Sequence, residues 1–168
     1  MKSLITVFFL LFLFSGCLKK VEYPIIPHIE FKKFDIIPNG NSKEAELTFS
    51  FTDGDGNIGL NQEDTTGINC SDTCLYYYNL FCEYYEKQGG EWIHYPIDWQ
   101  GGSTPFYYRI QDITPTGQNP SLAGEIIISL PSYYLHTTPG DTCRFEVKLV
   151  DRDLNESNSI ITSEFTKD

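Results

Sequence analysis

The sequence predicts an all-β fold, an antiparallel immunoglobulin-like β-sandwich of about seven to eight strands, with a closed β-barrel as the alternative. Short runs alternate apolar and polar residues, as in residues 45–52 and 143–150, and this is the period of half-buried strands. Clusters of Gly, Pro, Asn and Asp separate these runs, and no stretch sustains a helical period over a typical helix length. The Cys-Trp-Cys spacing of antibody domains is absent, so the prediction concerns architecture alone.

The first 16 residues are predicted to be a lipoprotein signal peptide. Lys2 precedes an apolar run over residues 4–14, which is too short for a transmembrane helix because crossing a bilayer takes about 20 residues. Ser15 and Gly16 then precede Cys17, and this string resembles the lipobox of bacterial lipoproteins, whose cysteine is acylated, with palmitate for example, and becomes the mature N-terminus. We therefore expect a lipid anchor on Cys17, the alternative being an ordinary signal peptide followed by a chance cysteine.

Residues 17–28 are predicted to form a short tether between lipid and domain. Pro24 and Pro27 favour extended backbone, which makes the tether stiff. Position 18 is Leu rather than the Asp that retains many enteric lipoproteins in the inner membrane, so this resemblance favours the outer membrane. The sequence leaves open whether the domain faces the periplasm or the cell surface.

Residues 29–168 are predicted to form the β-sandwich domain. Its expected strands are residues 29–37, 45–52, 75–86, 92–95, 106–113, 124–130, 143–150 and 159–166. The string Gln88-Gly89-Gly90 is expected at a hairpin tip.

Without Cys17, four of the five cysteines remain, and an even number in an exported chain favours structural disulfides. Alternation directs Cys82 and Cys143 towards the core. If their strands are antiparallel neighbours, the end of the first lies beside the start of the second, so we expect a Cys82–Cys143 disulfide. Cys70 and Cys74 share a polar loop in which a small ring is feasible. The other two connectivities stay open, and the spacing does not fit a zinc site.

The string from Phe51 to Leu60, FTDGDGNIGL, places Asp53, Asp55 and Asn57 at alternate positions, where their oxygens can bind a hard cation such as Ca²⁺. An EF-hand is excluded because Ile58 occupies the position that requires Gly. In an immunoglobulin-like topology this loop and the loop between the last two strands emerge at the same pole. The second loop carries Asp151 and Asp153, so a candidate calcium site combines both loops.

The alternative interpretation of these loops needs no metal. The glycines then form a tight turn, the aspartates cap it through their own backbone amides, and Arg152 neutralises the remaining charge. Thermal unfolding with calcium and with chelator distinguishes the two interpretations.

Aromatic residues gather in the middle of the chain, and Trp92, Trp99 and Tyr107 are candidates for a glycan- or peptide-binding platform. The alternative is core packing, since Tyr and Trp fill sandwich interiors with their polar ends at the edge. His94 and His136 lack a nucleophile in a recognisable motif, and no Gly-rich phosphate loop follows a strand. The many carboxylates leave a glycosidase pair open as an alternative, but most of them belong to the solvated faces of strands, so we expect no enzymatic activity.

The whole chain of 168 residues has 12 Lys plus Arg against 23 Asp plus Glu and a formal charge of −11, and it contains no basic cluster. Nucleic acid is therefore not an expected partner, because its binding depends on cationic side chains that neutralise phosphates.

Several strings together resemble small, uncharacterised outer-membrane lipoproteins of the Bacteroidota: Tyr23-Pro24 after the lipobox, residues 51–60, Asn79-Leu80, and LVDRDLNESNSIIT at residues 149–162. The resemblance implies an immunoglobulin-like sandwich on the outer membrane and supplies no catalytic residues. The acidic surface-export signal of that group is missing, because Lys19 and Lys20 follow the lipobox.

We expect a membrane-anchored, non-catalytic structural or accessory domain that acts through contacts with an envelope protein partner. The alternatives are a glycan- or peptide-binding module and a calcium-stabilised adhesion-type domain.

Overall fold

The computed structural model describes residues 21–40, 42–69, 74–95, 106–117, 120–130 and 142–166. The predicted signal peptide and Cys17, and likewise Cys70, Trp99 and His136, lie outside the described residues. Over these ranges, no helix has the length and apolar character needed to cross a membrane.

The described residues form nine strands and two short 3-10 helices, with no α-helix among them. The strands are β1 (His28–Asn39), β2 (Ser42–Asp53), β3 (Leu80–Gln88), β4 (Glu91–Tyr95), β5 (Tyr107–Tyr108), β6 (Leu122–Leu130), β7 (Thr142–Leu149), β8 (Ile160–Ile161) and β9 (Phe165–Thr166). The 3-10 helices are η2 (Gly67–Asn69) and η3 (Leu75–Tyr77). The all-β prediction is confirmed.

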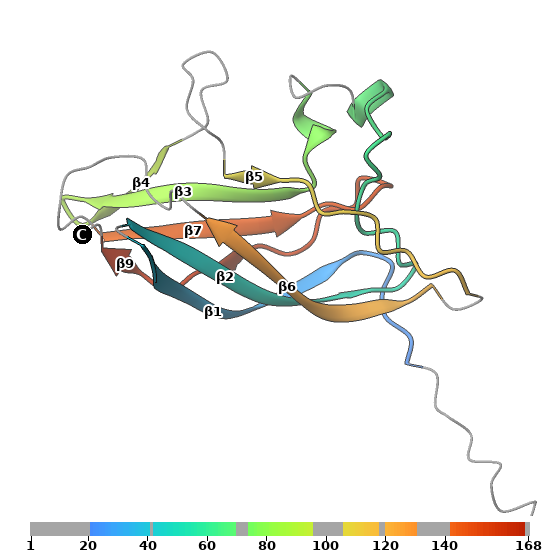
Figure 1. Cartoon of the computed structure of the whole chain (residues 1–168), viewed down its shortest axis with the longest axis horizontal. Coiled ribbons are helices and arrows are strands. Elements are labelled where there is room, and N and C mark those ends of the chain that lie inside the picture. The colour runs from blue at the N-terminus through green and yellow to red at the C-terminus, as the bar shows by residue number, and fades with distance from the viewer. Residues whose placement is uncertain are drawn as a thin grey trace, which may run out of the picture.

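The strands build two antiparallel sheets (Figure 1). One has the order β1-β2-β6, and the other has the order β4-β3-β7-β8 with β5 paired to β3 and β9 to β7. Their inward side chains form one apolar cluster, in which Phe49 of β2 and Phe145 of β7 are fully buried. Burying this surface is the main stabilising contribution that the two layers make to each other.

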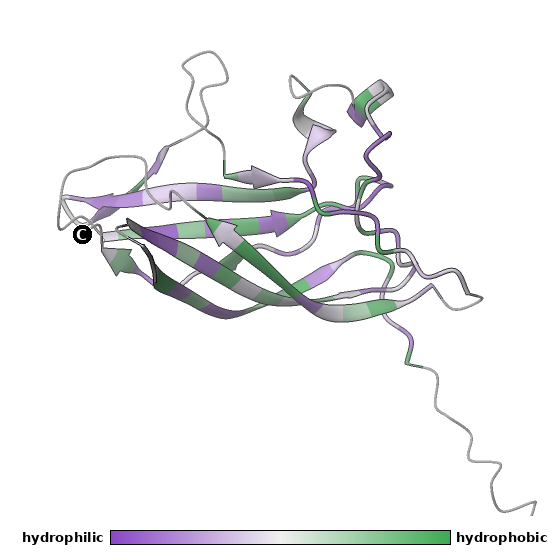
Figure 2. Ribbon diagram, viewed as in Figure 1, coloured by the Kyte–Doolittle hydropathy of each residue, from purple (hydrophilic) through white to green (hydrophobic). Residues whose placement is uncertain are grey.

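Alternation along the strands explains which face is buried, and Figure 2 shows it as alternating hydrophobic and hydrophilic bands. In β7, Phe145, Val147 and Leu149 are fully buried, whereas the residues between them are half-buried. Gly89 and Gly90 join β3 to β4 with φ of 58° and 93°, which confirms the predicted hairpin tip.

Two predicted strands are shorter in the structure. The predicted strand 75–86 begins only at Leu80, because residues 75–77 form η3, and the predicted strand 106–113 is reduced to β5. The Asn79 side chain bonds the backbone of Ile110 twice, with its Nδ2 3.1 Å from the Ile110 oxygen and its Oδ1 2.6 Å from the Ile110 nitrogen. A buried side-chain amide thus replaces strand pairing here.

The predicted Cys82–Cys143 disulfide is wrong. Both side chains point into the core as expected, but neither cysteine forms a disulfide. Cys82 lies opposite Val147 and Cys143 lies opposite Glu86, so four residues of β3, about 13 Å, separate the two positions. The prediction placed Cys82 near the end of its strand, whereas β3 begins only two residues before it.

A second cysteine pair was predicted in the loop before β3. Cys74 is disulfide-bonded, but its predicted partner Cys70 lies outside the described residues. The Cys70–Cys74 pairing therefore stays a prediction.

Candidate metal centre

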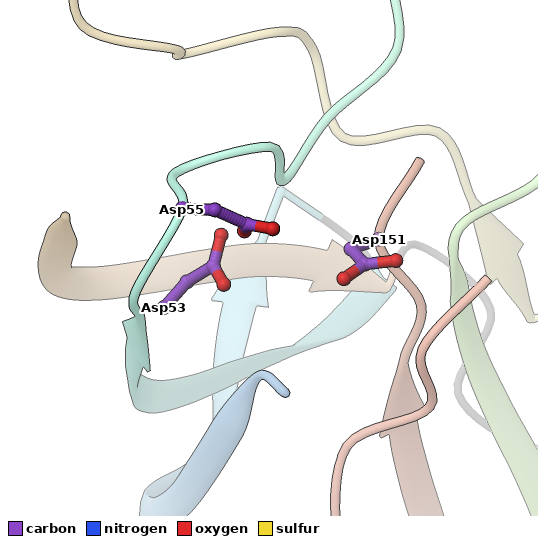
Figure 3. Close-up of side chains that lie close together, drawn as sticks. All are labelled: Asp53, Asp55 and Asp151. Atoms are coloured by element: carbon purple, nitrogen blue, oxygen red, sulfur yellow. The ribbon is translucent and has the colours of Figure 1, made fainter. Parts of the chain in front are cut away.

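The loops that follow β2 and β7 meet at one pole of the domain. Asp53 is the last residue of β2, Asp55 lies two residues after it, and Asp151 comes two residues after the end of β7. One carboxylate oxygen from each of the three lies within 4.8 Å of the others, and Figure 3 shows Asp151 approaching from a different segment of the chain. The prediction that the two acidic loops share a pole is confirmed.

Two glycines allow the first loop to pack tightly. A Cβ on Gly54 would lie 2.3 Å from the Tyr23 oxygen, and the Gly54 amide donates to the Pro24 oxygen at 2.8 Å. Gly56 has a φ of 65°, and a Cβ there would lie 1.8 Å from the Pro120 oxygen. The loop is therefore held between the tether and the segment that leads into β6.

Buried acceptors without donors distinguish this cluster from an ordinary acidic loop. Asp53 is 0% exposed, and no described residue forms a hydrogen bond of normal geometry with either of its carboxylate oxygens. The nearest polar neighbours are the Asp55 carboxyl group and the Asn57 backbone amide, whose weak capping contact is the part of the metal-free interpretation that the structure retains. Oδ1 of Asp55 and Oδ1 of Asn57 are also buried without a hydrogen-bond partner among the described residues. Buried polar atoms are normally paired with a donor or an ion. Four unpaired acceptors in one loop therefore favour a cation as their common partner.

The pKa of Asp53 is raised from 3.8 to about 6. Burial is the main cause, the charge of Asp55 and a hydrogen bond with its carboxyl group add to it, the charge of Asp151 adds less, and the Asn57 backbone amide opposes it. The ionised form of Asp53 is thus unfavourable beside the other two carboxylates, and a bound cation would remove that penalty.

Asn155 fixes the orientation of the third carboxylate. Its backbone amide donates to Asp151 Oδ1 and its side-chain amide donates to Asp151 Oδ2, both at 2.8 Å. Each carboxylate oxygen retains further lone-pair capacity, so these bonds aim Asp151 without exhausting it as a ligand.

Asn57 and Asp153 join the cluster indirectly. The Asn57 side-chain amide donates to Asp55 at 3.2 Å and to Asp153 at 3.1 Å, which leaves its Oδ1 as the buried acceptor. Asp153 is exposed and is not part of the three-carboxylate group. The structure therefore brings together Asp53, Asp55 and Asp151, with Asn57 beside them and Asp153 at the rim.

The metal-free interpretation required Arg152 to neutralise the loops, but its side chain points elsewhere. Its guanidinium lies 2.7 Å from Asp112 and 2.5 Å from the Thr114 hydroxyl. Among the described residues, no Lys or Arg forms an ion pair with any of the three clustered aspartates.

The spacing suits a calcium ion. Ca²⁺ binds oxygen at 2.3–2.6 Å, so ligands on opposite sides of one ion lie about 5 Å apart, and three oxygens within 4.8 Å of one another can all contact a single ion. Ca²⁺ also accepts an amide oxygen such as Asn57 Oδ1 and completes its shell with backbone carbonyls and water. The donors are all oxygens, which disfavours zinc.

The predicted aromatic platform is only partly described. Trp92 is half-buried, with Arg144 4.1 Å from its ring centroid and Lys87 at 5.3 Å. The Tyr107 hydroxyl donates to Glu83. Trp99 lies outside the described residues.

No sequence pattern marks the partners that complete these arrangements. Asp112 lies near the end of the predicted strand 106–113, beyond β5, and no motif indicates that it binds Arg152. Glu83 and Glu146 lie directly opposite each other on β3 and β7. Alternation alone could have placed both on the outer face, but only the register shows that they are neighbours.

No family model, curated protein or solved structure matches this chain.

Proposed function

We propose that this chain is a lipid-anchored, non-catalytic cell-envelope domain whose loop pole is held together by a calcium ion. The observation that carries the proposal is the fully buried Asp53 carboxylate, which forms no hydrogen bond of normal geometry with any described residue and lies beside the carboxylates of Asp55 and Asp151. Calcium here cross-links the end of β2 to the segment after β7, so it joins the two sheets at one pole.

The two-sheet order β1-β2-β6 and β4-β3-β7-β8 supports an immunoglobulin-like arrangement of this domain. The lipobox-like string at Cys17 supports an anchor in the outer membrane, and an unidentified envelope protein is the proposed partner. The domain then acts as a structural or accessory module that presents a surface for contact.

Thermal unfolding of the full-length chain in detergent tests the calcium site. The unfolding midpoint at neutral pH is expected to rise with added Ca²⁺ and to change much less with Mg²⁺, which demands shorter and more regular coordination. Asp53→Asn should abolish the calcium effect while leaving the domain folded. Glu125→Gln removes an exposed carboxylate of β6 and should leave the effect intact. An identical midpoint with calcium and with chelator overturns the proposal.

The lipid anchor needs its own test. Cys17→Ala should remove the acylation site, so the protein moves from the detergent phase to the aqueous phase on phase separation. Mass spectrometry of the mature N-terminus checks acylation directly. An unmodified Cys17 in the membrane-bound protein contradicts this part of the proposal and leaves the calcium site untouched.

A further inference from the structure

The outer face of the second sheet contains a cavity of about 340 Å³, away from the core. Its lining includes Phe81, Glu83 and Tyr85 of β3, Tyr107 of β5 and Glu146 of β7. Phe81 and Tyr107 pack edge to face with their ring centroids 4.7 Å apart.

Negative charge dominates the cavity. Its lining contains three carboxylates and one ammonium group. Lys148 pairs with Glu156 at 2.9 Å, and its charge also interacts with Glu146 and Glu83, so one cation faces three anions. Glu83 and Glu146 lie directly opposite each other across β3 and β7. Like charges at such positions destabilise a sheet, and a cation between them relieves the repulsion.

Tyrosine hydroxyls hold both carboxylates in place. Tyr107 donates to Glu83, and Tyr85 donates to Glu146 at 3.1 Å, while His94 Nε2 lies 2.9 Å from the second oxygen of Glu83. Burial and Glu146 raise the pKa of Tyr85, so its hydroxyl stays protonated as a donor. The acceptors are therefore preorganised.

The neighbouring part of the same face already holds a guanidinium between aromatic rings. Arg144 lies 4.1 Å from the centroid of Trp92 and 5.7 Å from that of Tyr85. Tyr85 is shared with the cavity, whose carboxylates add the partners that a guanidinium binds most strongly.

We propose that this cavity binds the arginine side chain of a partner polypeptide, with its guanidinium between Glu83 and Glu146 and its methylene stem against Phe81 and Tyr107. The site is distinct from the calcium centre, and the inference does not depend on calcium binding. It gives Tyr107 a role in peptide recognition.

Titration of the full-length chain with three peptides tests the proposal, with binding followed by NMR shifts of the β3 and β7 amides. The peptides are acetyl-Gly-Gly-Arg-Gly-Gly-amide and its citrulline and lysine counterparts. Citrulline is nearly isosteric with arginine but uncharged, so it should bind at least about tenfold more weakly, while lysine should fall between them because it lacks the planar fork. Equal binding of the arginine and citrulline peptides overturns the proposal.

The double variant Glu83→Gln/Glu146→Gln should weaken arginine-peptide binding by about tenfold or more, whereas Glu125→Gln on the other sheet should not change it. Because the double variant removes a repulsion, its thermal midpoint should be unchanged or higher, which separates lost recognition from lost folding. Undiminished binding by this variant overturns the proposal. The proposal is also overturned if a neutral chito-oligosaccharide saturates the cavity while the arginine peptide does not bind. Repeating the titration in chelator should preserve binding, so failure of the calcium centre and failure of this site are distinguishable.

Discussion

The guanidinium of Arg152 pairs with Asp112, 2.7 Å away, although Asp151 and Asp153 flank it in the chain. Hydrogen bonds from the hydroxyl and backbone amide of Thr114, together with Arg152 itself, lower the pKa of Asp112 to about 2. Asp112 is therefore ionised at any neutral or mildly acidic pH. It binds the Arg152 side chain, which forms no ion pair with the clustered carboxylates of Asp53, Asp55 and Asp151.

Asp112→Asn should weaken calcium binding. The released Arg152 can then turn towards the carboxylates and compete with the ion. Competition by one positive charge at a partly solvated site should lower the calcium affinity by roughly threefold. Isothermal titration of the full-length chain with calcium measures the change. Adding Arg152→Gln to this variant should restore the affinity. If the double variant binds calcium as weakly as Asp112→Asn alone, the loss comes from a disordered loop and not from competition.

The stability of the calcium-free domain should fall as the pH rises from about 4 to about 6. The ordinary pKa of an aspartate side chain is 3.8, whereas that of Asp53 in the fold is about 6, so between these pH values the folded state holds a proton that the unfolded state has released. The free energy of unfolding should decrease by an amount on the order of 2–3 kcal/mol over this range. Urea unfolding at several pH values checks it, and Asp53→Asn should lose this dependence.

Calcium should reverse the sign of this pH effect. The ion binds the ionised carboxylate, so protonation of Asp53 competes with it and the stabilisation by calcium grows as the pH passes 6. The difference in unfolding midpoint between calcium-loaded and calcium-stripped protein should be larger at pH 7.5 than at pH 5. An equal difference at both pH values would show that Asp53 is not a ligand.

Hydropathy alternation predicted the parts of this fold that depend on local pattern. The strands β2 and β7, their buried faces and the common pole of the two acidic loops follow from period-two alternation and from strand order. Asp53, Asp55 and Asp151 could be identified as one candidate site for this reason.

Features that depend on side-chain pairing between distant segments could not be predicted in the same way. Asn79 bonds the Ile110 backbone at the point where β3 begins and just after β5 ends, so both strands are shorter than predicted. An Asn between strand-forming residues does not indicate a partner 31 residues away. The register of β3 against β7 decides whether Cys82 meets Cys143, and a shift of four residues leaves the apolar pattern of both strands unchanged.

Gly54→Ala should loosen the tether from the domain. The added Cβ would meet the Tyr23 and Pro24 oxygens at 2.3 and 2.7 Å, so the tether or the calcium loop must move, at a cost of about 1–3 kcal/mol. Limited proteolysis should then cut the tether faster, and the thermal midpoint should fall. Gly117→Ala is the matched control, because a Cβ there meets no atom within 4 Å. Equal behaviour of the two variants contradicts a tether clamped by the loop.

Cys82 and Cys143 should both be recovered as thiols without any reducing agent. Burial raises the pKa of Cys82, and Cys143 is fully buried with its sulfur 3.0 Å from the Tyr84 hydroxyl, so neither should react with iodoacetamide in the folded protein. Unfolding in denaturant should expose both, and peptide mass spectrometry should find each one alkylated. Recovery of a disulfide-linked peptide that joins them would contradict the β3–β7 register, because that register places Cys143 beside Glu86 and not beside Cys82.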